Sequence, residues 1–190
     1  MTKLIIGLIG YSGSGKSVFT EVARDKYNIV TISTGEFVRN EVNIRGLEIN
    51  TQNMVEIGNL LRKENDGIFM RALNTNINQT LGKHDCVIID CLREYADYEE
   101  LAKRKPCVDL TIVKIISSNN NRYNRMLKRG RDKSFDILKF NTLTEFERKL
   151  ENNRLSQLAQ YVINNDSGLK AFKTEISKVL ANIKRTTTST

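Results

Sequence analysis

The chain has 190 residues, of which 39% are hydrophobic, and this is enough for a single domain with a buried core. No apolar run approaches the ~18 residues that cross a membrane, and the short, glycine-broken apolar start does not resemble a signal peptide. The net charge is +8, and the one histidine, His84, excludes histidine-based catalytic triads and multi-histidine metal sites. The three cysteines, Cys86, Cys91 and Cys107, lack the spacing of a metal site, so we expect them to be reduced core residues of a cytoplasmic protein.

The first predicted element is a strand over residues 4–9, and it leads directly into a segment that matches G-x-x-x-x-G-K-[ST]. The motif comprises Gly10, Tyr11, Ser12, Gly13, Ser14, Gly15, Lys16 and Ser17. The apolar residues that follow, between Val18 and Ala23, have the spacing of one helix face. A strand, a glycine-rich loop and a helix are the context in which this motif forms a phosphate-binding loop.

The chemistry of this loop is specific. Glycines let the backbone curl so that successive N–H groups point inward and bind an anion, and the helix that starts there adds its partial positive charge. Lys16 is placed to reach the β- and γ-phosphates of a nucleotide, and the hydroxyl of Ser17 is placed to ligate Mg²⁺. We therefore expect the chain to bind a nucleoside triphosphate, with ATP and Mg²⁺ as its cofactors.

Strands and helices alternate along the rest of the chain. Further strands are predicted at 29–32, 86–90, 108–116 and 161–164. Helices are predicted at 34–46, 51–64, 68–81, 95–104, 119–129, from about 142, and at 168–183, with a loop at 130–140 and a flexible tail at 184–190. This alternation predicts an α/β fold of the P-loop NTPase type, in which helices flank a five-stranded parallel sheet and ligands bind at the carboxyl ends of the strands. We expect one domain over residues 1–183.

Positive charge is concentrated in one segment of the chain. Residues 122–154 carry ten Lys or Arg against five Asp or Glu, so they hold +5 of the net charge. A local arginine cluster suits a site that handles phosphates, whereas a basic surface also suits nucleic acid. Both interpretations stay open at this point.

Four further segments fall where the strand ends would meet the phosphate loop. They are STGEFVR (33–39), DCLR (90–93), the basic segment 122–131 with Arg148 beyond it, and NNDSG (164–168). Together with the phosphate loop they resemble the nucleoside monophosphate kinases: STGEFVR is similar to the S-T-G-D-x-x-R of adenylate kinases, and DCLR to their D-G-x-P-R without the proline. Residues 3–180 resemble more closely an archaeal group of dephospho-coenzyme A kinase-like and nucleotide kinase-like proteins, which have D-G-x-R, R-G-R-x-D and V-x-N-D-G-[ST] motifs.

The resemblance implies roles for residues on the acceptor side of the site. Thr34 and Arg39 would hold an acceptor nucleotide, with Arg39 on its phosphate, and Arg93 would be a second ligand of that phosphate. Asp90 would orient Mg²⁺ through water. An acceptor that is an alcohol would also need a carboxylate to take its proton, and Glu36 or Asp90 would supply one.

On the donor side, the resemblance implies a small helical lid that closes over the transferring phosphate. Arg125, Arg129 and Arg131 would belong to this lid. Asn165 and Asp166 would border the base of the donor nucleotide. Phosphoryl transfer depends on positioning and on cations around the phosphates, which Lys16, Mg²⁺ and mobile arginines would provide.

The family resemblance divides the domain into acceptor-binding helices over about 34–81 and a lid over about 122–154. A free (deoxy)nucleoside monophosphate fits STGEFVR best as the acceptor. Some phage kinases of this superfamily instead phosphorylate 5-hydroxymethyluracil within DNA, and the basic excess suits such a polyanionic substrate. Dephospho-coenzyme A and a non-enzymatic ATP-binding switch are the remaining alternatives, while the lack of N-K-x-D argues against a GTPase. We expect no membrane partner.

Overall fold

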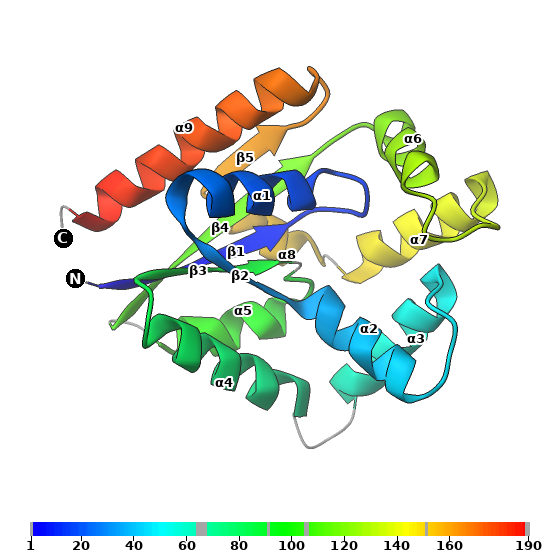
Figure 1. Ribbon diagram of the computed structural model, residues 1–190, viewed down its shortest axis with the longest axis horizontal. Helices are drawn as coiled ribbons and strands as arrows, with labels where there is room; N and C mark the ends of the chain where they lie inside the picture. Colours follow the sequence, from blue (N-terminus) through cyan, green and yellow to red (C-terminus); the bar gives the residue numbers. More distant parts are fainter. Residues whose placement is uncertain (1, 64–67, 91, 105–106, 151, 189–190) are drawn as a thin grey trace.

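The computed structural model describes residues 2–63, 68–90, 92–104, 107–150 and 152–188. Within these residues the chain forms a parallel sheet of five strands with helices on both faces, as the sequence predicted (Figure 1). The strands are β1 (Lys3–Ile9), β2 (Val30–Ser33), β3 (Cys86–Asp90), β4 (Val108–Ile116) and β5 (Tyr161–Asn164). Their order across the sheet is β2-β3-β1-β4-β5, so that β1 lies at the centre.

Helices connect the strands and cover the sheet (Figure 1). They are α1 (Lys16–Tyr27), α2 (Thr34–Ile44), α3 (Thr51–Lys63), α4 (Ile68–Leu81), α5 (Tyr95–Ala102), α6 (Asn119–Arg129), α7 (Ile137–Leu150), α8 (Asn152–Gln157) and α9 (Leu169–Thr188). No helix in the described ranges is both long enough and apolar enough to cross a bilayer.

Two helix boundaries differ from the sequence prediction by more than two residues. Helix α7 begins inside the predicted loop, because the carboxylate of Asp136 accepts a hydrogen bond of 2.9 Å from the backbone N–H of Lys139 and caps the new helix. Helix α9 continues through residues 184–188, where the threonine-rich sequence predicted a flexible tail. Ile183 is buried in the core, and this packing supports the last turns of the helix.

The core has two halves because β1 is buried on both of its faces, as is usual for the central strand of a parallel sheet. Leu4, Ile6 and Leu8 point to the half that α1 and α9 cover. Ile5 and Ile9 point to the other half, which is covered by α2, α4 and α5. The alternation of side chains along this one strand therefore anchors both helix layers.

The cysteine prediction was wrong for Cys107. This residue is exposed rather than part of the core. It lies in the turn before β4, where its backbone N–H donates to the carbonyl of Arg104. Cys86 is half-buried at the start of β3, and burial raises the pKa of its thiol to about 12. Cys91 lies outside the described residues.

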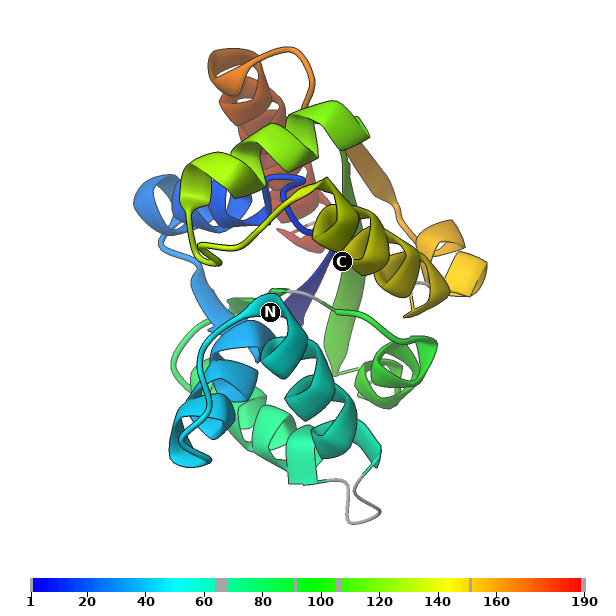
Figure 2. The same ribbon diagram turned by 90° about the vertical axis from the view of Figure 1, so that its right-hand side faces the viewer.

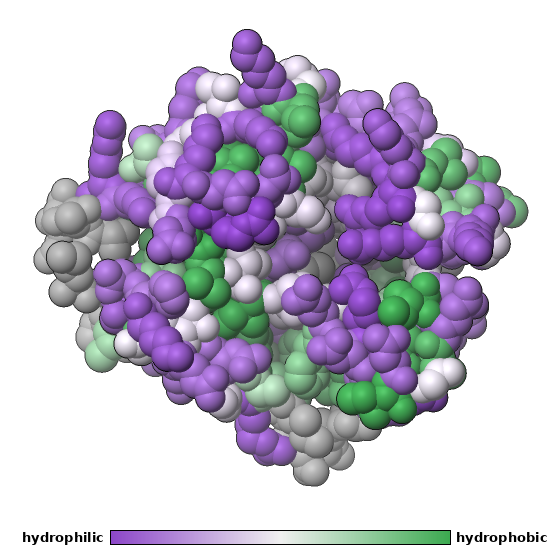
Figure 3. Space-filling model, viewed as in Figure 1, coloured by the Kyte–Doolittle hydropathy of each residue, from purple (hydrophilic) through white to green (hydrophobic). Residues whose placement is uncertain are grey.

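Two helical arms project beyond the carboxyl ends of the strands (Figures 1 and 2). The α2–α3 arm follows β2, and the α6–α7 arm follows β4. The face of the molecule that Figure 3 shows is mostly hydrophilic, with some apolar side chains toward the side on which the arms project. Ile44 at the end of α2 and Leu138 in the first turn of α7 are the most exposed of the large hydrophobic residues described. The end of β1 and the loop that follows it lie between the arms.

Candidate active site

The loop between β1 and α1 has the glycine backbone conformations expected of a phosphate-binding loop. Gly10, Gly13 and Gly15 have φ angles of +142°, +80° and +117°, which side-chain-bearing residues rarely adopt. A Cβ atom at Gly13 would lie 2.7 Å from the carbonyl oxygen of Arg122, so the loop also packs too closely against α6 for any side chain there. These positions confirm the sequence prediction that the glycines shape the loop.

A cavity of about 470 Å³ opens between this loop and the two arms. Such a volume lies within the usual range for sites that bind small molecules. The phosphate-loop residues that line it are Ser12, Gly13, Gly15, Lys16 and Ser17. The strand ends and the α2–α3 arm contribute, among others, Ser33, Thr34, Glu36, Arg39, Asn50, Thr51, Met54, Asn59, Asp90 and Arg93. The α6–α7 arm contributes Met126, Arg129, Arg131, Asp132, Phe135 and Leu143.

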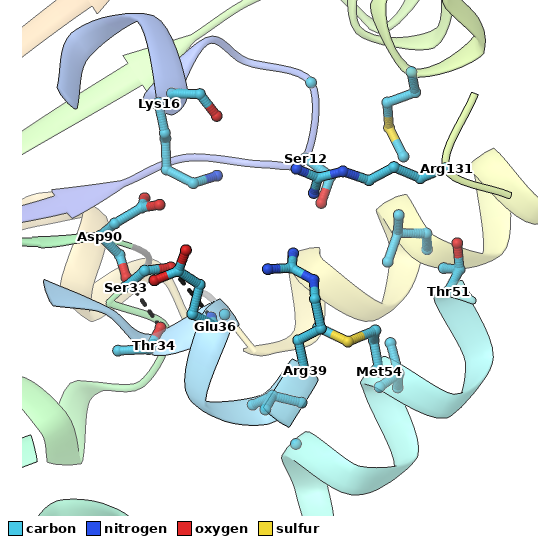
Figure 4. Close-up of a pocket in the computed structure, with 18 of the residues that line it drawn as sticks. Ser12, Lys16, Ser33, Thr34, Glu36, Arg39, Thr51, Met54, Asp90 and Arg131 are labelled. Atoms are coloured by element: carbon cyan, nitrogen blue, oxygen red, sulfur yellow. Dashed lines mark hydrogen bonds between the residues drawn. The ribbon is translucent and has the colours of Figure 1, made fainter. Parts of the chain in front are cut away.

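Lys16 lies at the inner end of the cavity, in the first turn of α1. Its Nζ donates hydrogen bonds to the carbonyl oxygens of Gly10 and Tyr11, so the side chain folds over the phosphate loop. Ser17 lines the cavity next to it. Figure 4 shows the Lys16 amine beside the carboxylate of Asp90, at the end of β3.

Asp90 is placed by sheet register, because it pairs with Leu8 of β1 and with Ser33 of β2. Its Oδ1 oxygen is buried and, among the described residues, has no hydrogen-bond partner. Burial raises the pKa of this carboxyl, and the positive charges of Lys16 and Arg93 counteract part of that rise. A buried carboxylate oxygen without a partner, beside a phosphate-binding loop, provides the hard ligand that Mg²⁺ prefers. The residues present therefore fit a magnesium nucleotide.

The predicted acceptor residues all line the same cavity. Thr34 lines the cavity at the start of α2, and its hydroxyl donates a hydrogen bond of 3.0 Å to the backbone carbonyl of Asp90. The carboxylate of Glu36 lies close to that of Asp90, whereas Arg39 points into the middle of the cavity (Figure 4). Arg93 lines the wall after β3.

The predicted lid arginines separate into two groups. Arg129 and Arg131 line the cavity, and Arg131 points toward Arg39 from the opposite arm (Figure 4). Burial lowers the pKa of Arg131, and the charges of Arg129 and Arg39 lower it further, so the three cations lie close together. Arg125 does not line the cavity; it donates to the carbonyl oxygens of Gly13 and Asn165 behind the loop.

The two residues predicted to border the donor base also lie behind the loop rather than in this cavity. The amide of Asn165 is buried and donates a hydrogen bond of 2.7 Å to the carbonyl of Ser14. Asp166 is exposed and accepts hydrogen bonds from Ser117, Ser118 and Asn121 at the start of α6, which lower the pKa of its carboxyl to about 2. Their predicted contact with a base stays a prediction.

Sequence reasoning missed the apolar and amide residues of the cavity wall, and it assigned no individual role to Arg122. Met54, Asn59 and Phe135 line the cavity without belonging to any recognised motif. Arg122 was counted only as part of the basic segment 122–131, whereas its side chain is 1% exposed and forms an ion pair with Glu147. A pair so far apart in the sequence leaves no local signal.

Comparison with known proteins identifies the family of the chain. The model of an AAA domain matches residues 9–139. A UPF0200 protein of Methanococcus maripaludis is 30% identical over 184 residues, covering 94% of this chain and 97% of the relative.

Among solved structures, shikimate kinase from Acinetobacter baumannii in complex with shikimate has a TM-score of 0.59 at 15% identity, covering 98% of this chain and 95% of that one. A gluconokinase from Sinorhizobium meliloti has a TM-score of 0.55 at 16% identity, covering 97% of each chain. These likenesses show the fold of P-loop kinases, as the sequence predicted. The chain therefore belongs to the AAA-domain family and to the UPF0200 proteins.

Proposed function

We propose that this protein is an ATP-dependent kinase that transfers the γ-phosphoryl group of ATP to a nucleotide acceptor, with a (deoxy)nucleoside monophosphate as the preferred acceptor. The observation that carries the proposal is the convergence of Arg39, Arg129 and Arg131 on one cavity, from two arms, opposite Lys16. Among the described residues, none of the three arginines forms an ion pair or side-chain hydrogen bond. Such a cluster is unfavourable by itself and is stabilised by a ligand with several phosphate charges.

The donor side of the cavity suits a magnesium nucleotide. Lys16 and the phosphate-loop N–H groups would hold the β- and γ-phosphates, and Ser17 with Asp90 would hold Mg²⁺, directly or through water. When bound, Mg²⁺ neutralises phosphate charge. The residues of the chain then have to keep the reacting phosphates in line and exclude water, which is most of what phosphoryl transfer requires.

The acceptor side combines a cationic end with a wall that suits a planar base. Arg39 and Arg93 would bind the acceptor phosphate near the phosphate loop. On other parts of the cavity wall, Met54 and Phe135 provide apolar contacts, and Asn59 provides an amide that donates and accepts hydrogen bonds. A nucleoside monophosphate has this same division between an anionic and a planar, polar-edged end.

A second acceptor class is favoured by the position of Glu36. Its carboxylate lies beside that of Asp90 at the inner end of the cavity, close to Lys16 (Figure 4). A phosphate acceptor needs no base, whereas a hydroxyl acceptor needs a carboxylate to take its proton. The hydroxymethyl group of 5-hydroxymethyluracil in DNA is such an acceptor, and the basic segment around the α6–α7 arm suits the DNA backbone.

The test is an acceptor screen with radiolabelled ATP and Mg²⁺. The acceptors are the set of (deoxy)nucleoside monophosphates, dephospho-coenzyme A, and duplex DNA with and without 5-hydroxymethyluracil, each repeated with the Lys16→Ala variant. Label on a mononucleotide that disappears with Lys16→Ala supports the proposal. Label that requires the modified base supports the second acceptor class and assigns proton removal to Glu36 or Asp90. ATP binding without transfer to any acceptor overturns the kinase proposal in favour of a nucleotide switch.

A further inference from the structure

Ser12, the third residue of the phosphate loop, is held by side chains of the α6–α7 arm through every polar group that it has. Its backbone N–H donates to both carboxylate oxygens of Glu147, at 3.0 Å each, and its hydroxyl donates to Glu147 Oε1 at 2.6 Å. Its carbonyl oxygen accepts a hydrogen bond of 2.9 Å from Nε of Arg122. The loop and the arm are therefore one hydrogen-bonded unit.

The pair that makes these contacts is buried. Arg122 is 1% exposed and Glu147 is 7% exposed, and the distance from Arg122 Nη2 to Glu147 Oε2 is 3.3 Å. The guanidinium of Arg122 lies 4.8 Å from the ring centre of Tyr11 and 5.1 Å from that of Phe140. The side-chain oxygens of Thr144 and Asn119 also accept hydrogen bonds from this guanidinium.

A buried ion pair is weak as a means of stabilising a fold, because desolvation offsets much of its Coulomb attraction. Here both members of the pair form hydrogen bonds with the backbone of Ser12. Apolar side chains could fill the same space but could not form these hydrogen bonds. The loop needs such support, since Gly13 and Gly15 next to Ser12 and Ser14 would leave its backbone free to take many conformations. We therefore expect these contacts to restrict the backbone conformation of the phosphate loop.

We propose that Glu147 is a positioning residue, which with Arg122 fixes the phosphate loop in its anion-binding conformation. The inference rests on the proposed function in one respect, namely that the phosphate loop is the ATP site. Glu147 acts through Ser12 and does not touch the nucleotide. Arg122 neutralises the carboxylate, which would otherwise repel the phosphates that bind on the opposite side of the loop.

The test is the affinity for Mg·ATP, measured by titration calorimetry on the full chain at a temperature where circular dichroism shows each variant folded. Glu147→Ala removes the acceptor for the Ser12 N–H, and we expect Mg·ATP to bind about ten- to a hundredfold more weakly. Glu147→Gln keeps an oxygen for that N–H and should recover most of the affinity. Glu145→Ala is the matched control, because Glu145 lies on the same helix, is exposed and pairs with Arg148.

A third variant, Glu147→Asp, covers the case in which Glu147→Ala does not fold. It keeps the charge beside Arg122 but withdraws the carboxylate from Ser12 by one methylene, so the affinity should fall as for alanine. Wild-type affinity in Glu147→Asp or Glu147→Ala, with only the melting temperature lowered, would show a merely structural pair and overturn the inference. Failure of the wild-type chain to bind Mg·ATP is a different result, because it overturns the proposed function first.

Discussion

The guanidinium groups of Arg39 and Arg131 face each other across the cavity, one from α2 and the other from the loop that follows α6 (Figure 4). Repulsion from Arg39 and Arg129, added to burial, lowers the pKa of Arg131. The arrangement is unfavourable without a ligand and becomes favourable once an anion lies between the two side chains. A phosphorylated ligand would therefore remove a repulsion between the two arms as well as bind to both.

This repulsion predicts that Arg131→Gln has opposite effects on stability and on binding. Without ligand the variant should have a slightly higher melting temperature than the wild type. The gain in unfolding free energy should be about 0.5 kcal/mol or less because solvent screens the charges, and it should shrink as salt is added. Acceptor affinity should fall about tenfold or more. Differential scanning calorimetry at low and high salt measures the first effect. Arg148→Gln is the control, since Arg148 has an exposed ion pair with Glu145 and should gain nothing; a lower melting temperature for Arg131→Gln would contradict the repulsion.

Lys16→Ala should reduce phosphoryl transfer by about a thousandfold or more, because the ammonium group is the cation closest to the reacting phosphates. The fold should be little affected, since Lys16 Nζ bonds only to carbonyl oxygens of the loop, those of Gly10 and Tyr11, within the described residues. Transfer of labelled phosphate and the melting temperature are the two measurements. Lys26→Ala, on the exposed side of the same helix, should keep full transfer activity. Normal turnover in Lys16→Ala would argue against the phosphate-loop assignment.

Asp90 makes stability depend on pH. Its carboxyl has a pKa of about 3.8 when unfolded, and burial raises this pKa in the folded chain. The folded state thus holds its proton more tightly, so this group stabilises the fold below about pH 4 and that contribution is lost as the pH rises through the folded-state pKa. Asp90→Asn cannot ionise, so at pH 7 its unfolding free energy should exceed that of the wild type by on the order of 1 kcal/mol. The same variant should lose transfer activity.

The measurement for Asp90 is a series of melting temperatures from pH 4 to pH 8 for the wild type and Asp90→Asn. The difference between the two should widen with pH and vanish near pH 4. Mg²⁺ with ATP should narrow it at neutral pH, because a cation beside the carboxylate favours the ionised form. A difference that stays constant with pH would mean that Asp90 does not titrate as its burial requires.

Gly13→Ala should cost both stability and nucleotide binding. The residue has a φ of +80°, and a Cβ atom would lie 2.7 Å from the backbone of Arg122, so the loop would have to move away from α6. We expect a loss of about 2–3 kcal/mol in unfolding free energy. Gly46→Ala isolates the conformational part of this cost, because Gly46 also has a positive φ, +68°, but no atom within 4 Å of a Cβ; its loss should be about 1 kcal/mol. Equal losses for the two variants would show that packing against α6 is unimportant.

Many residues of the candidate site could be predicted from the sequence because they lie close together along the chain. The phosphate loop occupies eight consecutive residues, and Thr34, Glu36 and Arg39 follow one strand end in a single turn and a half of helix. Parallel strands bring such ends to one edge, so the proximity of Asp90 to the loop also follows from alternation alone.

The parts that the sequence did not reveal depend on contacts between distant segments. Arg122 and Arg125 look the same as Arg129 in a basic helix, and only the direction of each side chain separates loop support from cavity lining. Glu147 carries no motif, since its partner Ser12 lies 135 residues earlier. The start of α7 is a different case, because Asp136 was a local capping signal that the polar composition of the segment obscured.

The long reach of these contacts has a consequence for the order of folding. The phosphate loop leaves the ribosome well before its supports at Arg122, Glu147 and Asn165, which are synthesised more than 100 residues later. A nascent chain that ends before these residues has the motif without the binding site. ATP can therefore stabilise the finished domain by mass action but cannot assist the folding of its amino-terminal half.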